Sequence, residues 1–297
     1  MTAEDAQLKV MALHLIRRGG KRLRPALLML CGTYGESRDQ QLLQAAAALE
    51  LMHVASLYHD DIMDRAPMRR GGVSTNARWG SPQAAFAGTW LFARACELWA
   101  SFGAVPNELT SRMAVDLCRG QLNEMEHAFD TDAHEATHLN IIALKTGSLF
   151  ALPCRLGAVL GGCSDQVTDA LTRYGVALGL AFQLADDLLD LTADTAQIGK
   201  LAGKDLREGI YSLAVLHALR SPHESPALRD LLDRVAMGDD EVQQALGLLR
   251  ESGAVDYARQ RATQHAEDAR AALTTLPPGD ARDSLHALTY LAVNRVS

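Results

Sequence analysis

The sequence has few aromatic residues and lacks the patterns that mark strands or paired cysteines. Phe, Trp and Tyr make up 5% of its 297 residues. Alternation of apolar and polar residues, the pattern of a half-buried strand, is absent. No CxxC pair occurs among the five cysteines, which are Cys31, Cys96, Cys118, Cys154 and Cys163. Their odd number and wide spacing favour free thiols in a reducing compartment over disulfides or a zinc site.

Signals for export or membrane insertion are also missing. The first residues, MTAED, are acidic rather than basic, and they open an amphipathic helical pattern instead of a signal peptide. No window approaches the roughly 20 apolar residues that span a bilayer. The net charge of −7 argues against nucleic acid as the main partner. We therefore expect a cytoplasmic protein with at most loose membrane association.

Apolar residues at helical spacing dominate the chain. They predict long helices over residues 40–64, 84–103, 109–129, 139–161 and 166–191. Polar connections rich in Gly, Pro, Ser and Asp separate these segments, and the longest cover 65–83 and 192–212. No connection is long enough to be a flexible interdomain linker. The pattern predicts an all-α protein of ten or more helices, with residues 1–297 in a single domain.

Two of these helices end in the same acidic pattern, D-D-x-x-D. The six aspartates are Asp60, Asp61, Asp64, Asp186, Asp187 and Asp190. The first and last carboxylates of each motif share a helix face and repel each other unless a cation intervenes. Mg²⁺ takes oxygen ligands, commonly a few carboxylates with waters and substrate phosphates. One such motif is compatible with a solvated helix end, but the repetition predicts Mg²⁺ ions around a diphosphate.

Basic residues accompany both motifs. The densest cationic stretch, RRGGKRLRP at 17–25, has five Lys and Arg in nine residues. Other basic residues close to the motifs are Arg69, Arg70, Lys145, Lys200 and Lys204. A solvated surface explains any one of them. Together they predict two bound anionic groups, for which the planar fork of arginine is well suited.

Five motifs occur in an order that resembles one known family. "GGKRLRP", "HDDIMDxxxxRRG", "KTGSLF", "FQLADDLLD" and "GKxxGKDLREG" are similar to those of the trans-isoprenyl diphosphate synthases, or polyprenyl synthetases, over residues 15–220. The resemblance implies a single bundle of long helices around a central cavity, the isoprenoid synthase fold, in a homodimer. It also implies head-to-tail (1′–4) condensation of isopentenyl diphosphate with an allylic diphosphate. Three Mg²⁺ ions would assist loss of the allylic diphosphate group.

The same resemblance implies a role for each matching residue. Direct metal ligands are Asp60, Asp64 and Asp186, with Asp61, Asp187 and Asp190 as additional or water-mediated ligands. Isopentenyl diphosphate is held by Lys21, Arg24, His53 and Arg70. The allylic diphosphate contacts Arg69, Lys145 and Lys200. The residues expected to be catalytic are Lys145, Thr146, Gln183 and Lys200, and Asp205 is expected to order a water or a lysine.

Product length is expected to depend on residues below the first motif. Ala55 and Ser56 lie about one helical turn before Asp60, and both are small. Leu51 and Met52 lie one turn deeper, roughly 12–13 Å from Asp60, as a lower floor or as lining. This predicts an all-trans product of geranylgeranyl length or longer. The direction in which Tyr58 points is left open.

Several rival functions stay open at this point. A terpene cyclase of the same fold steers cations with aromatic faces, of which this chain has few. A head-to-head synthase would leave the basic isopentenyl site unexplained. A non-catalytic subunit of a heteromeric synthase would typically lose aspartates from one motif. An iron-binding bundle is disfavoured because its Glu-x-x-His ligand set is missing.

Overall fold

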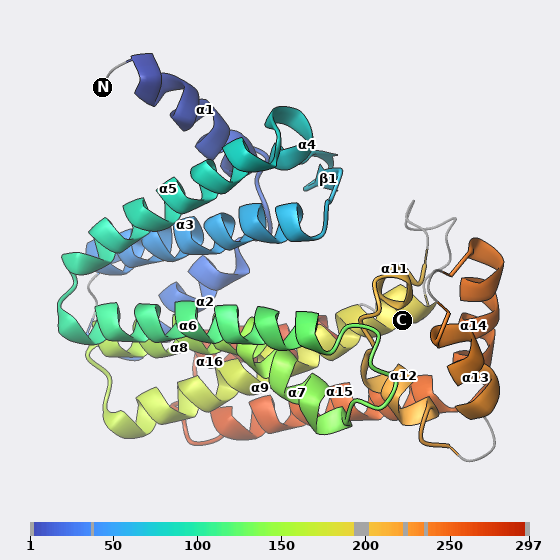
Figure 1. Cartoon of the computed structure of the whole chain (residues 1–297). Helices are drawn as coiled ribbons and strands as arrows, with labels where there is room; N and C mark the ends of the chain where they lie inside the picture. The colour runs from blue at the N-terminus through green and yellow to red at the C-terminus, as the bar shows by residue number, and fades with distance from the viewer. Residues whose placement is uncertain (1–2, 37–38, 193–201, 222–224, 235–236, 295–297) are drawn as a thin grey trace. The chain divides into compact units, whose positions relative to one another are not determined.

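The computed structural model describes residues 3–36, 39–192, 202–221, 225–234 and 237–294 (Figure 1). The described chain is helical apart from one short hairpin, which confirms the predicted all-α class. It divides into two compact units. Unit 1 comprises Met1–Ser111 with Pro153–Thr168, and unit 2 comprises Arg112–Leu152 with Asp169–Ser297. The expectation of one domain over residues 1–297 stays a prediction.

The helices of the N-terminal part are α1 (Ala3–Arg17), α2 (Leu23–Gly32), α3 (Asp39–Met63), α4 (Thr75–Trp79), α5 (Ser81–Ala100) and α6 (Ala104–Glu126). The middle of the chain forms α7 (Glu135–Ile142), the π-helical turn η1 (Ala143–Gly147), α8 (Ser148–Gly161) and α9 (Asp165–Thr192). The remaining helices are α11 (Lys204–Arg207), α12 (Leu213–Ala218), α13 (Ser225–Leu232), α14 (Asp239–Glu251), α15 (Ala254–Leu273) and α16 (Asp280–Val293). The five long predicted helices are all present, with ends shifted by a few residues.

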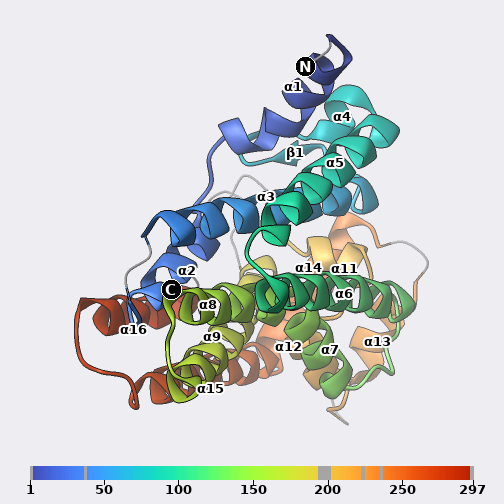
Figure 2. The ribbon, with the colours of Figure 1, turned by 90° about the vertical axis from the view of Figure 1, so that its left-hand side faces the viewer.

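Unit 1 is organised around α3. This helix packs along α5 and against α2, as Figures 1 and 2 show. Tyr58 of α3 is fully buried, and its hydroxyl oxygen lies 2.7 Å from the carbonyl oxygen of Met11 and 3.0 Å from that of Ala12. These bonds attach α1 to α3, which answers the question of where Tyr58 points. The apolar cluster beneath them includes Ala55 and Leu91.

Unit 2 has its core between α9, α12, α14 and α15. Leu188, Val215, Leu246 and Ala262, one from each helix, belong to a single apolar cluster. Helix α15 also packs along α16 (Figures 1 and 2). The face of α9 that carries Leu188 is buried in this core, and the second acidic motif lies near the C-terminal end of the same helix.

The connection over residues 65–83 contains structure that the sequence did not predict. Strands β1 (Met68–Arg69) and β2 (Gly72–Val73) pair antiparallel and are joined by Arg70 and Gly71. Both turn residues have positive φ, 50° and 71°. Such two-residue turns match the natural twist of a hairpin. These four strand residues are too few to show alternation in the sequence, and they leave the all-α class unchanged.

The expectation about apolar windows also needs correction. Among the described residues, the continuous helical segment Glu135–Gly161 is long and apolar enough to cross a membrane by length and composition. However, 61% of its most apolar window is buried inside the protein. A core helix of a soluble protein gives the same signal, since it is apolar on several faces.

Candidate active site

The first acidic motif lies at the C-terminal end of α3 (Figure 1). Asp60 is half-buried and Asp64 is exposed, whereas Asp61 has no exposed surface. Carboxylates at this end of a helix meet the negative end of its dipole, which adds to their mutual repulsion. A cation offsets both effects. The donor set therefore fits a hard divalent ion that completes its shell with waters and phosphate oxygens.

Asp61 is turned toward the protein. Its Oδ1 accepts a hydrogen bond from Nε of Arg69 at 2.6 Å and lies 2.5 Å from Nη2 of the same guanidinium in an ion pair. Asn76 donates to the Asp61 backbone carbonyl at 3.0 Å. A buried carboxylate is stable only when it is paired. Asp61 therefore holds the hairpin against the end of α3. The positive charge of Arg69 is balanced by this carboxylate.

Arg70 occupies the hairpin turn and reaches back to α1. Its Nη1 donates to the carbonyl oxygens of Leu15, at 3.2 Å, and of Gly19. Its Nη2 lies 3.5 Å from a carboxylate oxygen of Glu50 on α3. A Cβ at Gly20 would stand 3.0 Å from the Arg70 guanidinium carbon, and Gly20 has φ of 149°. The glycine pair thus allows the loop after α1 to pass directly over this guanidinium.

Arg24 and His53 form the centre of the predicted isopentenyl diphosphate site. Nη1 of Arg24 donates to Nε2 of His53 at 3.1 Å. Burial, followed by the positive charges of Arg24 and Arg70, holds the pKa of His53 well below its usual value. The imidazole is therefore neutral, accepts at Nε2 and carries its proton on Nδ1. Within the described residues that Nδ1 is buried without a hydrogen-bond partner. Lys21 is exposed nearby in sequence.

The pKa of Arg24 is lowered to about 10, mainly by burial, while the charge of Glu50 acts in the opposite direction. Arg24 thus remains cationic at neutral pH. The group of Arg24, Arg70 and neutral His53 offers several N–H donors. A diphosphate group would satisfy such donors.

In unit 2, Lys145 and Thr146 lie in the π-helical turn η1. Two close contacts of neighbouring helices hold this turn. A Cβ at Gly179 of α9 would stand 2.9 Å from the Gly147 Cα, and one at Gly120 of α6 would stand 2.7 Å from the Lys145 Cγ. Only glycine permits these approaches without displacement. Single π turns are frequent at functional sites because they re-aim side chains.

Thr146 belongs to a hydrogen-bonded chain that ends on the second acidic motif. Its hydroxyl donates to Oε1 of Gln183 at 2.7 Å. Nε2 of Gln183 donates to Oδ1 of Asp187 at 2.8 Å, and Nε2 of His138 lies 3.1 Å from Oδ2 of the same carboxylate. Thr146 and Gln183, both expected to be catalytic, therefore contact each other directly. His138, which lies in α7, was missed because it belongs to none of the five motifs.

Lys145 also has a protein partner that the sequence did not reveal. Its Nζ lies 2.5 Å from a carboxylate oxygen of Glu124 on α6, and both side chains are about one-quarter exposed or less, at 27% and 20%. Nothing in the spacing of these residues, which are far apart in sequence, indicated the pair. The positive charge of Lys145 is balanced by Glu124, as that of Arg69 is balanced by Asp61 in unit 1.

The other aspartates of the second motif differ in exposure. Asp186 is exposed, while Asp190 is half-buried. The Asp190 carboxylate accepts the backbone N–H groups of Lys204 at 3.1 Å and Asp205 at 3.0 Å. Burial, followed by the charges of Asp190 and Asp187, raises the pKa of Asp205 well above its usual value. Asp190 thereby fixes the start of α11, which leaves Asp186 as the outward-facing carboxylate of the motif.

The predicted residues thus fall into two groups, one in each unit. Lys200 lies outside the described residues. In the described part of the chain, no three His, Cys, Asp or Glu side chains stand close enough to hold an ion by themselves. The carboxylates of Asp61, Asp187 and Asp190 are each engaged with protein donors. Mg²⁺ sites that rely on substrate phosphates need only one or two carboxylates.

The residues expected to set product length have different surroundings. Ala55 is 1% exposed and belongs to the apolar cluster between α1, α3 and α5. Ser56 is half-buried, and its hydroxyl donates to the His53 carbonyl at 2.8 Å. Leu51 is half-buried, whereas Met52 is buried with its sulfur 3.0 Å from the indole nitrogen of Trp99. Their roles in product length stay predictions.

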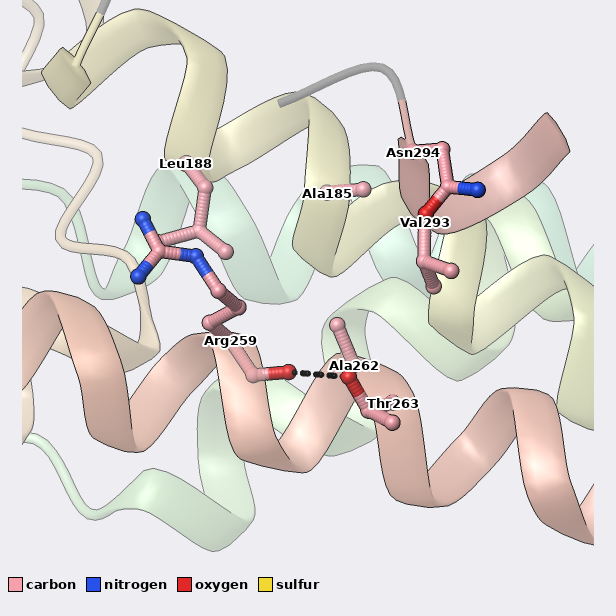
Figure 3. A pocket seen from close by; sticks show the side chains of 7 residues that line it. All are labelled: Ala185, Leu188, Arg259, Ala262, Thr263, Val293 and Asn294. Atoms are coloured by element: carbon pink, nitrogen blue, oxygen red, sulfur yellow. Dashed lines mark hydrogen bonds between the residues drawn. The ribbon is translucent and has the colours of Figure 1, made fainter. Parts of the chain in front are cut away.

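A separate pocket of about 370 Å³ lies in unit 2 (Figure 3). It is lined by Ala185, Leu188, Arg259, Ala262, Thr263, Val293 and Asn294. Thr263 donates its hydroxyl hydrogen to the Arg259 carbonyl at 2.9 Å. The lining includes none of the predicted site residues, so this pocket is distinct from the groups described above.

Comparison with known proteins identifies the family. Residues 5–249 match the profile of the polyprenyl synthetase family. The nonaprenyl diphosphate synthase of Mycobacterium tuberculosis is 38% identical over 285 residues, which are 95% of this chain and 85% of that protein. The geranylgeranyl diphosphate synthase of Methanosarcina mazei is 35% identical over 269 residues, which are 89% and 82% of the two chains.

A solved structure extends the similarity to the fold. The polyprenyl synthase from Caulobacter crescentus, crystallised with calcium and isoprenyl diphosphate, has a TM-score of 0.92 and 36% identity. The match covers 100% of this chain and 92% of that one. The fold is therefore the all-α isoprenoid synthase fold. The chain belongs to the polyprenyl synthetase family, and it is an enzyme that transfers prenyl groups.

Proposed function

We propose that the protein condenses isopentenyl diphosphate head-to-tail (1′–4) with an allylic diphosphate to give an all-trans polyprenyl diphosphate. The observation that carries the proposal is the Arg24–His53 group. His53 is half-buried and neutral, and its buried Nδ1–H is left without a protein acceptor in the described residues. A second bound diphosphate supplies that acceptor. A terpene cyclase uses one diphosphate substrate and has no need of this group.

The residues of the two acidic motifs fit bound Mg²⁺, of which we propose three ions. Asp60, Asp64 and Asp186 are the proposed direct ligands: Asp60 is half-buried, and Asp64 and Asp186 are exposed. When bound, Mg²⁺ neutralises the leaving diphosphate as a Lewis acid. Asp61, Asp187 and Asp190 support the site through the protein contacts described above or through waters.

The reaction breaks one bond and forms another. The allylic C1–O bond breaks and releases diphosphate, and the double bond of isopentenyl diphosphate then forms the new 1′–4 carbon–carbon bond. Loss of one proton restores a double bond, so the products are the longer prenyl diphosphate, diphosphate and H⁺. Arg69, Lys145 and Lys200 bind the leaving group. Thr146 and the Gln183 carbonyl oxygen lie near the reacting carbons and stabilise the positive charge that develops there.

The test is product formation by the full chain with isopentenyl diphosphate, each allylic primer and Mg²⁺. We expect a longer prenyl diphosphate that disappears when EDTA removes the metal. Absence of any condensation product with every primer would overturn the proposal and favour a non-catalytic subunit. Formation of a cyclic hydrocarbon from the allylic diphosphate alone would favour a cyclase.

We propose a product of geranylgeranyl length or longer. Ser56, one turn below Asp60, is small and half-buried, so it does not block growth of the chain at that depth. The relatives named above make both geranylgeranyl and nonaprenyl products, according to their names. Chromatography of the products made with each primer gives the length directly.

We also propose a cytoplasmic homodimer with a single domain over residues 1–297. A row of exposed side chains on α6 and just after it supports the dimer. It consists of Val115, Cys118, Leu122, Met125 and Phe129. The four that lie on α6, Val115, Cys118, Leu122 and Met125, are spaced three, four and three residues apart, as in a helix seam that packs on another helix. The four apolar members other than Cys118 are 53–60% exposed.

Sedimentation of the wild type and of Leu122→Glu tests the dimer. We expect a dimeric wild type and a monomeric variant. Asn107→Glu, also on α6 and exposed but outside this row, is the matched control and should stay dimeric. A monomeric wild type would contradict the homodimer and would favour a role as one component of a heteromeric synthase, such as the relative named heptaprenyl diphosphate synthase component 2.

A further inference from the structure

The Asp187 carboxylate is enclosed by protein donors from two sides. His138 of α7 and Gln183 of α9 each contact one of its oxygens, at 3.1 Å and 2.8 Å. His138 is 7% exposed and Asp187 is 8% exposed. Each carboxylate oxygen thus has a protein hydrogen bond in a buried setting. A pair of this kind holds both side chains in one orientation, because either partner alone would be left unsatisfied.

This carboxylate decides how the Gln183 amide is oriented. An ionised carboxylate only accepts hydrogen bonds, so only the NH₂ end of the amide can face it. The carbonyl end, Oε1, must then point the other way, where Thr146 donates to it at 2.7 Å. If the amide were reversed, its NH₂ group would face the reacting carbons. Partial positive charge there would oppose a carbocation, whereas the carbonyl oxygen favours it.

The backbone beneath this network is held closely. Gly175, Gly179, Gln183 and Asp187 follow one another at intervals of four on α9, and therefore share one face. A Cβ at Gly175 would stand 2.6 Å from the Phe150 carbonyl oxygen. The glycines let α9 approach η1 and α8, which brings Gln183 within reach of Thr146. His138 is then the one member of the network that none of the five motifs contains.

We propose that His138 is a positioning residue for the reaction. By donating from Nε2 to Oδ2 of Asp187, it keeps that carboxylate directed at Gln183, and so keeps the Gln183 carbonyl oxygen directed toward the reacting carbons. Asp187 is accordingly an anchor for the amide and not a direct metal ligand. This inference rests on the proposed function, because it assigns a role within the condensation reaction.

The first test compares three variants of the full-length enzyme. His138→Leu removes the donor, and His138→Gln restores an N–H donor on a side chain of similar reach. His134→Leu is the matched control, since His134 is exposed one turn earlier and makes no capping hydrogen bond through its side chain. We expect His138→Leu to lower kcat about 10- to 100-fold with KM changed less than about threefold, and His138→Gln to recover most of the loss.

A double-variant cycle separates positioning from a general effect on folding. If His138 acts through Gln183, adding His138→Leu to Gln183→Leu lowers kcat by less than about twofold further. Full independent losses in the double variant, or a His138→Leu variant with the kcat of His134→Leu, would overturn the inference. Thermal unfolding of each variant shows which ones are folded. If His138→Leu does not fold, the comparison of His138→Gln with the wild type still tests the inference. An inactive wild type would instead contradict the proposed function itself.

Discussion

Oδ1 of Asp61 accepts a hydrogen bond from Nε of Arg69 at 2.6 Å and lies 2.5 Å from Nη2 of the same guanidinium in an ion pair, although both residues were expected at the substrate or the metal. The second carboxylate of the first motif thus stabilises the hairpin, whereas its neighbour Asp60 is half-buried and Asp64 is exposed. Asp187 holds the same place in the second motif and is enclosed in the same way. In both motifs, therefore, the second aspartate is held by hydrogen bonds from the protein.

The buried contacts of Asp61 predict that substitutions at Asp61 and Asp64 change the free energy of unfolding by different amounts. We expect Asp61→Asn to lower the free energy of unfolding by about 1–3 kcal/mol, because it removes the buried negative charge that is paired with the Arg69 guanidinium. Urea denaturation measures this change. Asp64→Asn is the control, since Asp64 is exposed, and it should change stability by less than about 0.5 kcal/mol. Equal effects of the two substitutions would contradict the structural role of Asp61.

The proposed metal ligands should affect turnover and leave stability nearly unchanged. We expect Asp60→Ala and Asp186→Ala each to lower kcat by about 10³-fold or more, since metal-assisted departure of diphosphate is lost. Steady-state kinetics at saturating Mg²⁺ measures this. Asp169→Ala, which alters an exposed aspartate on the same helix as Asp186, should keep wild-type kcat. Near-normal turnover in either motif variant would refute the metal assignment.

His53 should make stability depend on pH. Its pKa lies well below the ordinary value in the folded protein, because of burial and the nearby arginines, and near about 6.5 in the unfolded chain. Between these values only the unfolded chain binds the proton, so the free energy of unfolding falls as the pH is lowered from about 7.5 to 5.5. His53→Gln should show a shallower slope in urea denaturation over that range. Parallel slopes would show that His53 does not contribute.

The close contact between α9 and η1 gives a prediction about Gly179. A Cβ there would stand 2.9 Å from the Gly147 Cα, so Gly179→Ala must push η1 away from α9. We expect a loss of stability of about 1–3 kcal/mol and a lower kcat, because Thr146 moves away from Gln183. Gly247→Ala is the matched control on α14, where a Cβ meets nothing within 4 Å. That variant should be slightly stabilised, by up to about 1 kcal/mol.

Product length can be tested at Ser56. Its half-buried position one turn below Asp60 predicts that Ser56→Phe shifts the products to shorter chains, as measured by chromatography with a fixed primer. Ala55 is enclosed by the α1–α3–α5 cluster, so Ala55→Phe should instead destabilise the protein by about 1–3 kcal/mol. An unchanged product distribution in Ser56→Phe would contradict the proposed depth of the product chain.

The fold class could be predicted from the sequence, and candidate site residues could be named from its motifs, since both depend on local patterns. Apolar spacing located the long helices, and the two D-D-x-x-D motifs could be read directly. The hairpin could not be predicted, because its strands have two residues each and its turn needs Arg70 at a positive φ. The π-helical turn at Lys145 could not be predicted either, because it does not change the spacing of apolar residues. Glu50, Glu124 and His138 became visible only as contacts between residues distant in sequence.

These contacts show that basic residues counted as substrate ligands in the sequence already have carboxylate neighbours in the protein. Arg69 is paired with Asp61, Lys145 is paired with Glu124, and Arg70 lies beside Glu50. A diphosphate that engages these cations must therefore compete with a carboxylate already in place, so binding is in part an exchange of one anion for another. Such an exchange changes the net number of ion pairs less than the count of cations suggests. Substrate affinity should accordingly fall only gently as ionic strength rises.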